Sequence, residues 1–179
     1  TDIKSKLREI PEDQKRVLVY IHGYNVTFRE AATRAAQLGT DLNVPITAFY
    51  SWPSSGTTAG YLSDSAAIEA SEPMLIEFLR TLAKVADSSA VHLLVHSMGN
   101  RGVVRVLEQL SLLSRTDGFK SGQIILAAPD VDARVFRQRA GGFPCISART
   151  TLYVSRKDHA LEISRSLSSF PRAGLCPPV

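Results

Sequence analysis

The feature that most constrains this chain is a repeated order of one buried strand followed by one amphipathic helix. Short apolar, β-branched runs of the kind found in strands buried on both faces occur at residues 16–21, 46–52, 91–95, 123–128 and 151–155. Helical patterns separate them, and the clearest begins with a capping box from Thr27 to Glu30. The alternation predicts an α/β fold with a doubly wound, mostly parallel sheet and helices on both faces.

Length and charge restrict the function classes. The chain has 179 residues, of which 44% are hydrophobic and 21% charged, so we expect one globular domain over residues 1–179. The formal charge is +4, but basic and acidic residues alternate without a basic run, and we expect no nucleic-acid partner. No stretch approaches the roughly 20 apolar residues of a membrane span. The oligomeric state and the compartment stay open.

The most informative motif is the segment VHSMGN at residues 95–100, which directly follows a strand pattern and directly precedes a helix pattern. It is a variant of the nucleophile elbow G-x-S-x-G, with Val95 in place of the first glycine. In such a turn the serine hydroxyl is raised above the edge of the sheet. We therefore predict Ser97 as a nucleophile and the Met98 N–H as one oxyanion donor. The alternative is a serine that only caps a helix.

A second motif ends the first strand, where His22 and Gly23 precede Tyr24. A glycine allows the backbone to approach a substrate closely, so the Tyr24 N–H is the candidate for the second oxyanion donor. We expect His22 to brace this loop.

A carboxylate follows the last strand at Asp158, where it can orient a catalytic imidazole. Its alternative role is to cap the next helix. Asp130 and Asp132 follow the preceding strand and compete as the acid, although Asp132 fits better as a helix N-cap.

An apolar pocket for an acyl or aryl group is expected near Phe28 and Trp52, with core packing as an equal alternative for Trp52. No cluster of residues has metal-ligand spacing, and no G-x-G-x-x-G follows the first strand. We expect neither a metal nor a cofactor.

The runs VLVYIHGYN, FYSWPS, LLVHSMGNR, ILAAPDVDARVF and TLYVSRKDHAL together resemble a bacterial α/β-hydrolase family of undefined physiological function, over nearly the whole chain. The resemblance implies an α/β-hydrolase fold, a triad in the order Ser, Asp, His, and an esterase- or lipase-like activity. Ser97 and Asp158 match the family's nucleophile and acid.

The resemblance also implies a catalytic histidine after one further strand, and no such strand pattern follows Asp158. We therefore expect a chain truncated at its C-terminus, with the base beyond it. His159 is the substitute base within the chain, and it would need Asp130 or Asp132 as its acid. A serine hydrolase without its base loses about 10⁶ in turnover. A binding module that has lost catalysis and an acyltransferase that uses an alcohol in place of water are the rival functions.

Overall fold

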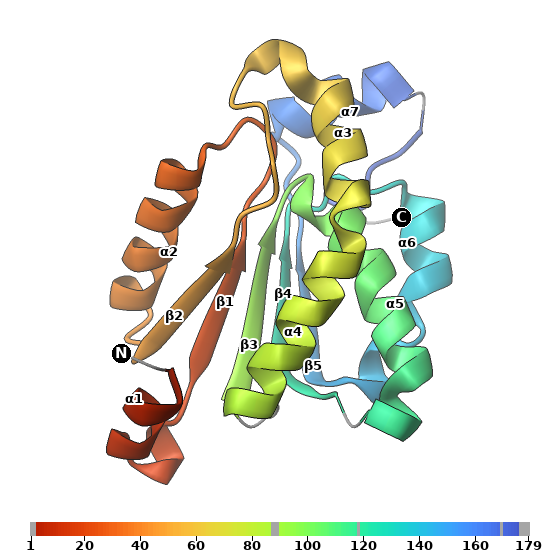
Figure 1. Cartoon of the computed structure of the whole chain (residues 1–179). Helices are drawn as coiled ribbons and strands as arrows, with labels where there is room; N and C mark the ends of the chain where they lie inside the picture. Colours follow the sequence, from red (N-terminus) through yellow and green to blue (C-terminus); the bar gives the residue numbers. More distant parts are fainter. Residues whose placement is uncertain (1–2, 87–89, 118, 169, 176–179) are drawn as a thin grey trace.

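A parallel sheet forms the centre of the computed structural model, which describes residues 3–86, 90–117, 119–168 and 170–175. Within these residues five strands pair in the order β2-β1-β3-β4-β5 and all run parallel (Figure 1). The strands are β1 (Val17–Ile21), β2 (Ile46–Tyr50), β3 (Val91–His96), β4 (Ser121–Ala127) and β5 (Ser147–Tyr153). The predicted α/β fold with a parallel sheet is confirmed.

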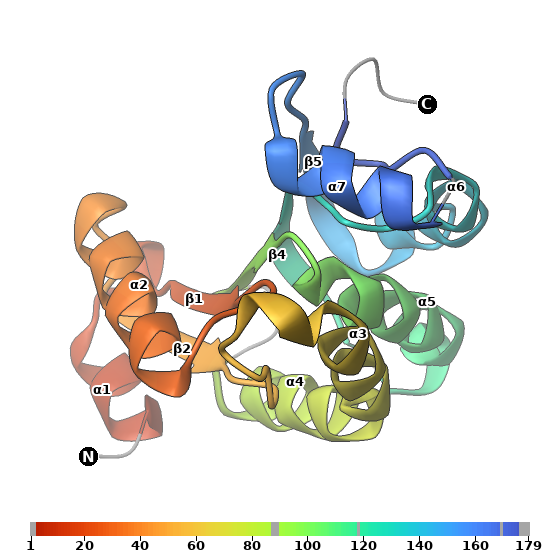
Figure 2. The ribbon, with the colours of Figure 1, turned by 90° about the horizontal axis from the view of Figure 1, so that it is seen from above.

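Helices cover the two faces of this sheet. The helix α2 lies against β1 and β2 on one face, while α4 and α5 lie on the other (Figure 2). At the end of the sheet where the strands finish, Figure 1 shows the start of α3 and the whole of α7. The helices are α1 (Ile3–Glu9), α2 (Phe28–Asp41), α3 (Tyr61–Ala70), α4 (Glu72–Ala86), α5 (Gly99–Asp117), α6 (Ala133–Ala140) and α7 (His159–Ser168).

Local sequence signals explain where several helices begin. Thr27 and Glu30 form the predicted capping box, in which the Thr27 side chain accepts from the Glu30 N–H and the Glu30 carboxylate accepts from the Thr27 N–H. Pro73 lies in the first turn of α4, where its missing N–H removes no helical hydrogen bond. The helical pattern of residues 64–86 is accordingly two helices that meet at Ser71.

The two faces of the sheet differ in burial. Val91, Leu93 and Val95 are fully buried beneath α4 and α5. The alternate residues of β3 point to the other face of the sheet and are less covered: Leu94 is half-buried and His96 is exposed. On that face α2 packs mainly over β1 and β2. The last residue of β3 therefore reaches the surface immediately before Ser97.

The strand predicted at residues 151–155 is shifted in the structure, since β5 spans Ser147–Tyr153. The first residues of β5 are polar, and Arg149 is exposed. Among the described strands β5 lies at the edge of the sheet and pairs with β4 alone. Backbone pairing, which leaves no apolar pattern, determines where this strand begins.

Candidate active site

Ser97 occupies a sharp turn between β3 and α5. Its φ is +50°, in the left-handed region that costs a residue with a side chain roughly 1–2 kcal/mol. Three backbone hydrogen bonds fix the turn: the Ser97 N–H donates to the Ala127 carbonyl at 2.9 Å, and the Ser97 carbonyl accepts from Asn100 N–H at 3.1 Å and Asp130 N–H at 3.2 Å. The turn therefore holds Ser97 in a strained conformation between a strand and a helix, at the position where the sequence predicts a nucleophile elbow.

Two glycines allow the loop after β1 to touch this turn. A Cβ atom on Gly23 would lie 2.9 Å from the Ser97 Cβ and 3.0 Å from the His96 Nδ1. A Cβ atom on Gly99 would overlap the His22 carbonyl oxygen. Both positions must therefore lack a side chain for the two segments to meet, and the peptide that joins Gly23 to Tyr24 is brought beside Ser97.

A branched residue, Val95, can replace the first glycine of the motif because of where its side chain lies. This side chain is completely buried in the core on the side of the sheet that α4 and α5 cover. The steric demand of the turn falls on Gly23 and Gly99 instead.

The two predicted oxyanion donors come from the two segments that meet here. Met98 directly precedes the first residue of α5, where backbone N–H groups have no acceptor within the helix, and its side chain is fully buried. The Tyr24 side chain is held in place, since its hydroxyl donates to the Thr58 carbonyl and its ring meets the Tyr61 ring edge-on at 5.5 Å.

Asp64, on α3, holds the same loop from the other side and was not identified from the sequence. Its carboxylate is buried and accepts hydrogen bonds from Ser54 Oγ at 2.6 Å, Ser55 N–H at 2.7 Å and Asn25 N–H at 3.3 Å. Burial raises the pKa of Asp64, but these hydrogen bonds outweigh it and lower the pKa overall. Asp64 thus joins the Tyr24–Asn25 loop, in which Asn25 has a φ of +56°, to the loop after β2.

His22 is buried under this loop and braces it, as predicted. Its ring stacks on Trp52 with a centroid distance of 4.9 Å and an angle of 12°, and its Nδ1 lies 2.9 Å from the Gly23 carbonyl oxygen. The Trp52 Nε1–H donates to the His22 carbonyl at 2.9 Å. Burial lowers the pKa of His22, so its ring favours the neutral form.

The two residues predicted to line a pocket have different environments. Trp52 is 1% exposed and packs in the core, which is one of the two roles that the sequence left open. Phe28 is 68% exposed at the start of α2, with its ring 5.2 Å from that of Phe49.

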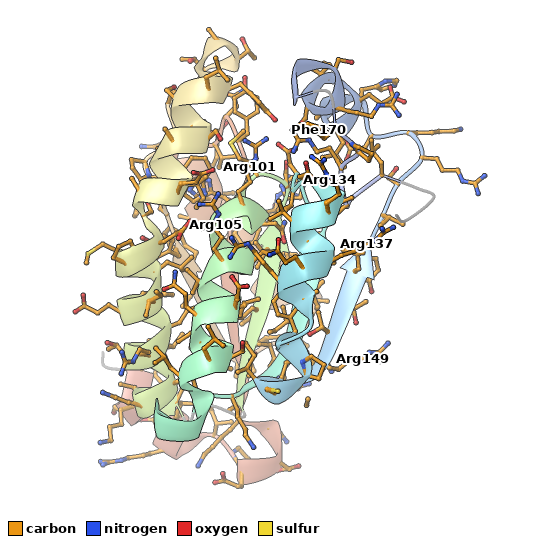
Figure 3. All side chains as sticks on the ribbon, turned by 90° about the vertical axis from the view of Figure 1, so that its right-hand side faces the viewer. Arg101, Arg105, Arg134, Arg137, Arg149 and Phe170 are labelled. Atoms are coloured by element: carbon orange, nitrogen blue, oxygen red, sulfur yellow. The ribbon has the colours of Figure 1, made fainter. Side chains whose placement is uncertain are left out.

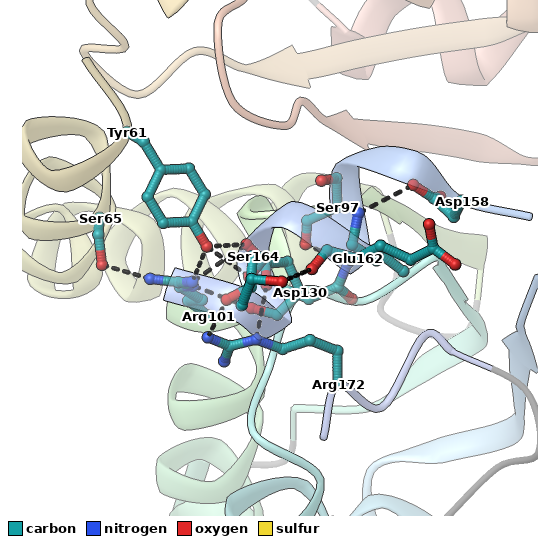
Figure 4. A network of polar contacts seen from close by, with 12 residues as sticks. Tyr61, Ser65, Ser97, Arg101, Asp130, Asp158, Glu162, Ser164 and Arg172 are labelled. Atoms are coloured by element: carbon teal, nitrogen blue, oxygen red, sulfur yellow. Dashed lines mark hydrogen bonds and ion pairs between the residues drawn. The ribbon is translucent and has the colours of Figure 1, made fainter. Parts of the chain in front are cut away.

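Asp158 lies directly before α7, where its Oδ1 accepts a hydrogen bond from the Leu161 N–H at 3.1 Å (Figure 4). The capping role is therefore present. Although His96 is exposed, the loop at Gly23 lies close to its ring, and lost hydration is the main cause that lowers the pKa of His96. The negative charge of Asp158 opposes this shift. Asp158 is consequently within electrostatic reach of the residue that precedes Ser97.

The substitute residues are placed differently. The His159 side chain is 89% exposed, with its Nδ1 3.4 Å from Glu162 Oε2. Asp132 caps α6, as predicted, by accepting from the Arg134 N–H at 2.8 Å. Asp130 is buried among two arginines, Tyr61 and Ser164 (Figure 4). In the part of the chain that the structure describes, none of the four histidines hydrogen-bonds to the Ser97 hydroxyl.

The described residues contain no group of three or more His, Cys, Asp or Glu arranged to hold a metal ion. None of their helices is both long and apolar enough to cross a membrane.

A protein-family model and a curated relative are similar to this chain. A family model described as "Alpha/beta hydrolase of unknown function (DUF900)" matches residues 1–179. A curated relative, "Uncharacterized protein alr1448" of Nostoc sp. (strain PCC 7120 / SAG 25.82 / UTEX 2576), is 28% identical over 125 residues. That match covers 55% of this chain and 33% of the relative, so the similarity spans about a third of the relative's length. No solved structure matches the chain significantly.

Proposed function

The chain belongs to the DUF900 family of alpha/beta hydrolases of unknown function, and from this premise we propose that it is the part of a serine hydrolase that carries the nucleophile Ser97. The observation that supports this most strongly is the turn at Ser97, where a serine adopts a φ of +50° and only glycines at 23 and 99 allow the neighbouring loop to touch it. A serine that merely capped a helix would need neither the strain nor the close approach.

The proposed reaction is the cleavage of a carboxylic ester through an acyl-enzyme. Ser97 Oγ forms a bond to the carbonyl carbon while an imidazole takes its proton, and the N–H groups of Met98 and Tyr24 hold the resulting oxyanion. The C–O bond to the alcohol then breaks, and the alcohol leaves with that proton. Water, deprotonated by the same imidazole, attacks the acyl carbon and releases the carboxylic acid and free Ser97.

Asp158 is the proposed acid that orients this imidazole and stabilises its charged form. Its position at the start of α7 and its electrostatic effect on His96 support the assignment. The proposal requires an imidazole as the base, and among the described residues no histidine hydrogen-bonds to the Ser97 hydroxyl: His92, for example, accepts from the Gln123 N–H at 3.0 Å through its Nδ1.

The test uses the full-length protein, treated with a fluorophosphonate and examined by intact-mass analysis and peptide mapping. We expect one adduct on Ser97, its loss in Ser97→Ala, and its retention in Ser63→Ala, which removes an exposed hydroxyl of the same kind. Hydrolysis of p-nitrophenyl acetate should follow the same pattern. An adduct on another residue, or full hydrolysis by Ser97→Ala, would refute the proposal.

The same experiment separates the two rival functions. A protein that gives neither an adduct nor hydrolysis would be a binding module. Faster acyl transfer to an added alcohol than to water would identify an acyltransferase instead.

A further inference from the structure

The carboxylate of Asp130 lies in a buried region where several helices meet, and both of its oxygens accept hydrogen bonds. Its side chain is 4% exposed. Oδ2 accepts from Tyr61 OH at 2.9 Å and from Arg101 Nη2 at 3.0 Å. Oδ1 accepts from Ser164 Oγ and lies 3.2 Å from Arg172 Nε. Two guanidinium groups therefore surround one carboxylate, a geometry in which charge-assisted hydrogen bonds are strong and the loss of the carboxylate is costly.

The partners of Asp130 come from parts of the chain that are distant in sequence. Tyr61 belongs to α3, Arg101 to α5, Ser164 to α7, and Arg172 to the segment after α7 (Figure 4). Arg101 makes two further hydrogen bonds in this network: its Nε donates to the Asp130 carbonyl at 2.9 Å, and its Nη1 donates to Ser65 Oγ at 2.5 Å.

The segment after α7 is fixed to the same region. Arg134 of α6 lies over the Phe170 ring at 3.9 Å, and both residues are labelled in Figure 3. The Ala133 N–H donates to the Pro171 carbonyl at 3.0 Å, and the Gly174 N–H donates to the Pro129 carbonyl at 2.9 Å. The chain is thus held both before and after Arg172, so Arg172 reaches Asp130 from an ordered backbone.

Asp130 also contacts the elbow directly. Its backbone N–H donates to the Ser97 carbonyl at 3.2 Å, while its carboxylate binds Ser164. Ser164 lies six residues after Asp158 on α7, a separation of about 9 Å along a helix. One residue therefore connects the backbone of Ser97 to α7, the helix that directly follows Asp158.

We propose that Asp130 is a positioning residue, which holds α7 so that Asp158 keeps a fixed place relative to Ser97. This inference rests on the proposed function, in which Ser97 and Asp158 act through a shared imidazole. Asp130 itself does not touch the substrate. The sequence offered it as a competing acid, but its carboxylate is already hydrogen-bonded to Arg101, Tyr61 and Ser164 and ion-paired with Arg172, so it is occupied in holding elements together.

A matched pair of substitutions on α7 tests the connection in the full-length protein. Ser164→Ala removes the hydroxyl that binds Asp130, whereas Ser166→Ala removes an exposed hydroxyl that donates to the Glu162 carbonyl of its own helix. We expect Ser164→Ala to lower kcat for p-nitrophenyl acetate at least tenfold with KM changed less than twofold. Ser166→Ala should leave both within twofold. Asp130→Asn, which keeps the shape but removes the charge, should lower kcat further.

Two further readouts separate positioning from a general loss of stability. In an Asp158→Ala background, Ser164→Ala should lower kcat less than twofold, because its effect passes through Asp158. Hydrogen exchange of the amides at residues 159–164 should accelerate at least tenfold in Ser164→Ala and not in Ser166→Ala.

An equal loss of kcat from Ser164→Ala with and without Asp158 would overturn the inference, and so would unchanged exchange in α7. Either result with an intact Ser97 adduct would leave the proposed function standing. If the wild-type protein gives no adduct, the proposed function fails and catalytic positioning fails with it, while exchange in α7 still decides whether Asp130 holds this helix.

Discussion

Replacing Gly23 by alanine tests the packing of the loop after β1 against the elbow. The added Cβ would lie 2.9 Å from the Ser97 Cβ and 3.3 Å from the His96 carbonyl oxygen. Carbon atoms prefer about 3.5–4.0 Å, so the two segments must separate by at least roughly 0.6 Å. The Ser97 N–H donates to the Ala127 carbonyl of β4, and the His22 carbonyl accepts from the Trp52 Nε1–H. Neither segment can therefore move apart without losing a hydrogen bond.

The expected cost of Gly23→Ala follows from this geometry. Overpacking of this kind costs about 1–3 kcal/mol. In a protein of this size each kcal/mol lowers Tm by about 2–4 °C, so a loss of about 2 kcal/mol corresponds to about 4–8 °C. The shift also moves the Tyr24 N–H away from Ser97, and a displacement approaching 1 Å can lower the rate about 10²-fold.

Thermal unfolding and ester hydrolysis by the full-length protein measure the two effects separately. Gly141→Ala is the control, because a Cβ there meets nothing within 4 Å. If Gly23→Ala melts within 1 °C of the wild type and keeps its kcat, the packing argument is wrong. If Tm falls while kcat holds, the assignment of the Tyr24 N–H as an oxyanion donor is wrong.

Three other perturbations address the strain, the buried imidazole and the buried carboxylate. Ser97→Gly should abolish hydrolysis yet raise the free energy of unfolding by about 1 kcal/mol through relief of the left-handed φ, whereas Ser97→Ala should leave stability nearly unchanged; urea denaturation compares them. Because the folded-state pKa of His22 is lowered, the unfolded chain binds this proton first, and stability should fall as the pH drops below about 6.5, by at most about 1.4 kcal/mol per pH unit for this group; unfolding in His22→Asn should show a shallower pH slope. Asp64 has a lowered pKa, so its stabilisation is present at neutral pH and lost as the pH falls below about 3.8; Asp64→Asn should cost about 1–3 kcal/mol at pH 7, lower kcat by releasing the Asn25 loop, and remove that acid-dependent part in a pH series of unfolding curves.

The fold followed from the sequence because its signals are local. Every predicted strand is present in the parallel sheet, and the capping box at Thr27 starts α2 where expected. Buried parallel strands need continuous apolar runs, and helix N-caps need particular side chains, so both leave a readable pattern. Two features leave no such pattern. β5 begins where its backbone pairs with β4, which does not require apolar residues. α1 was not predicted, because Leu7 is the one buried residue of that helix.

The roles of the carboxylates could not be ranked in the same way. Asp64 lies in the first turn of α3, Asp130 follows β4 and Asp158 precedes α7, and the residues beside each in sequence do not show which groups its carboxylate contacts. The structure gives each a different set of partners: loop N–H groups for Asp64, two arginines for Asp130, and a helix N-terminus near His96 for Asp158. The role of a carboxylate depends on the groups around it, and those around Asp130 come from segments as distant in sequence as Tyr61 and Arg172.

The sequence by itself determined the order of strands and helices, the turn that presents Ser97 and the family to which the chain belongs, because each depends on residues close together along the chain. Only the tertiary structure decided that Gly23 and Gly99, rather than position 95, relieve the crowding at the elbow, and that Asp130 is enclosed by Arg101 and Arg172. Those facts depend on which segments meet across the carboxyl ends of the strands, and steric and electrostatic contacts between distant segments leave no local pattern to read.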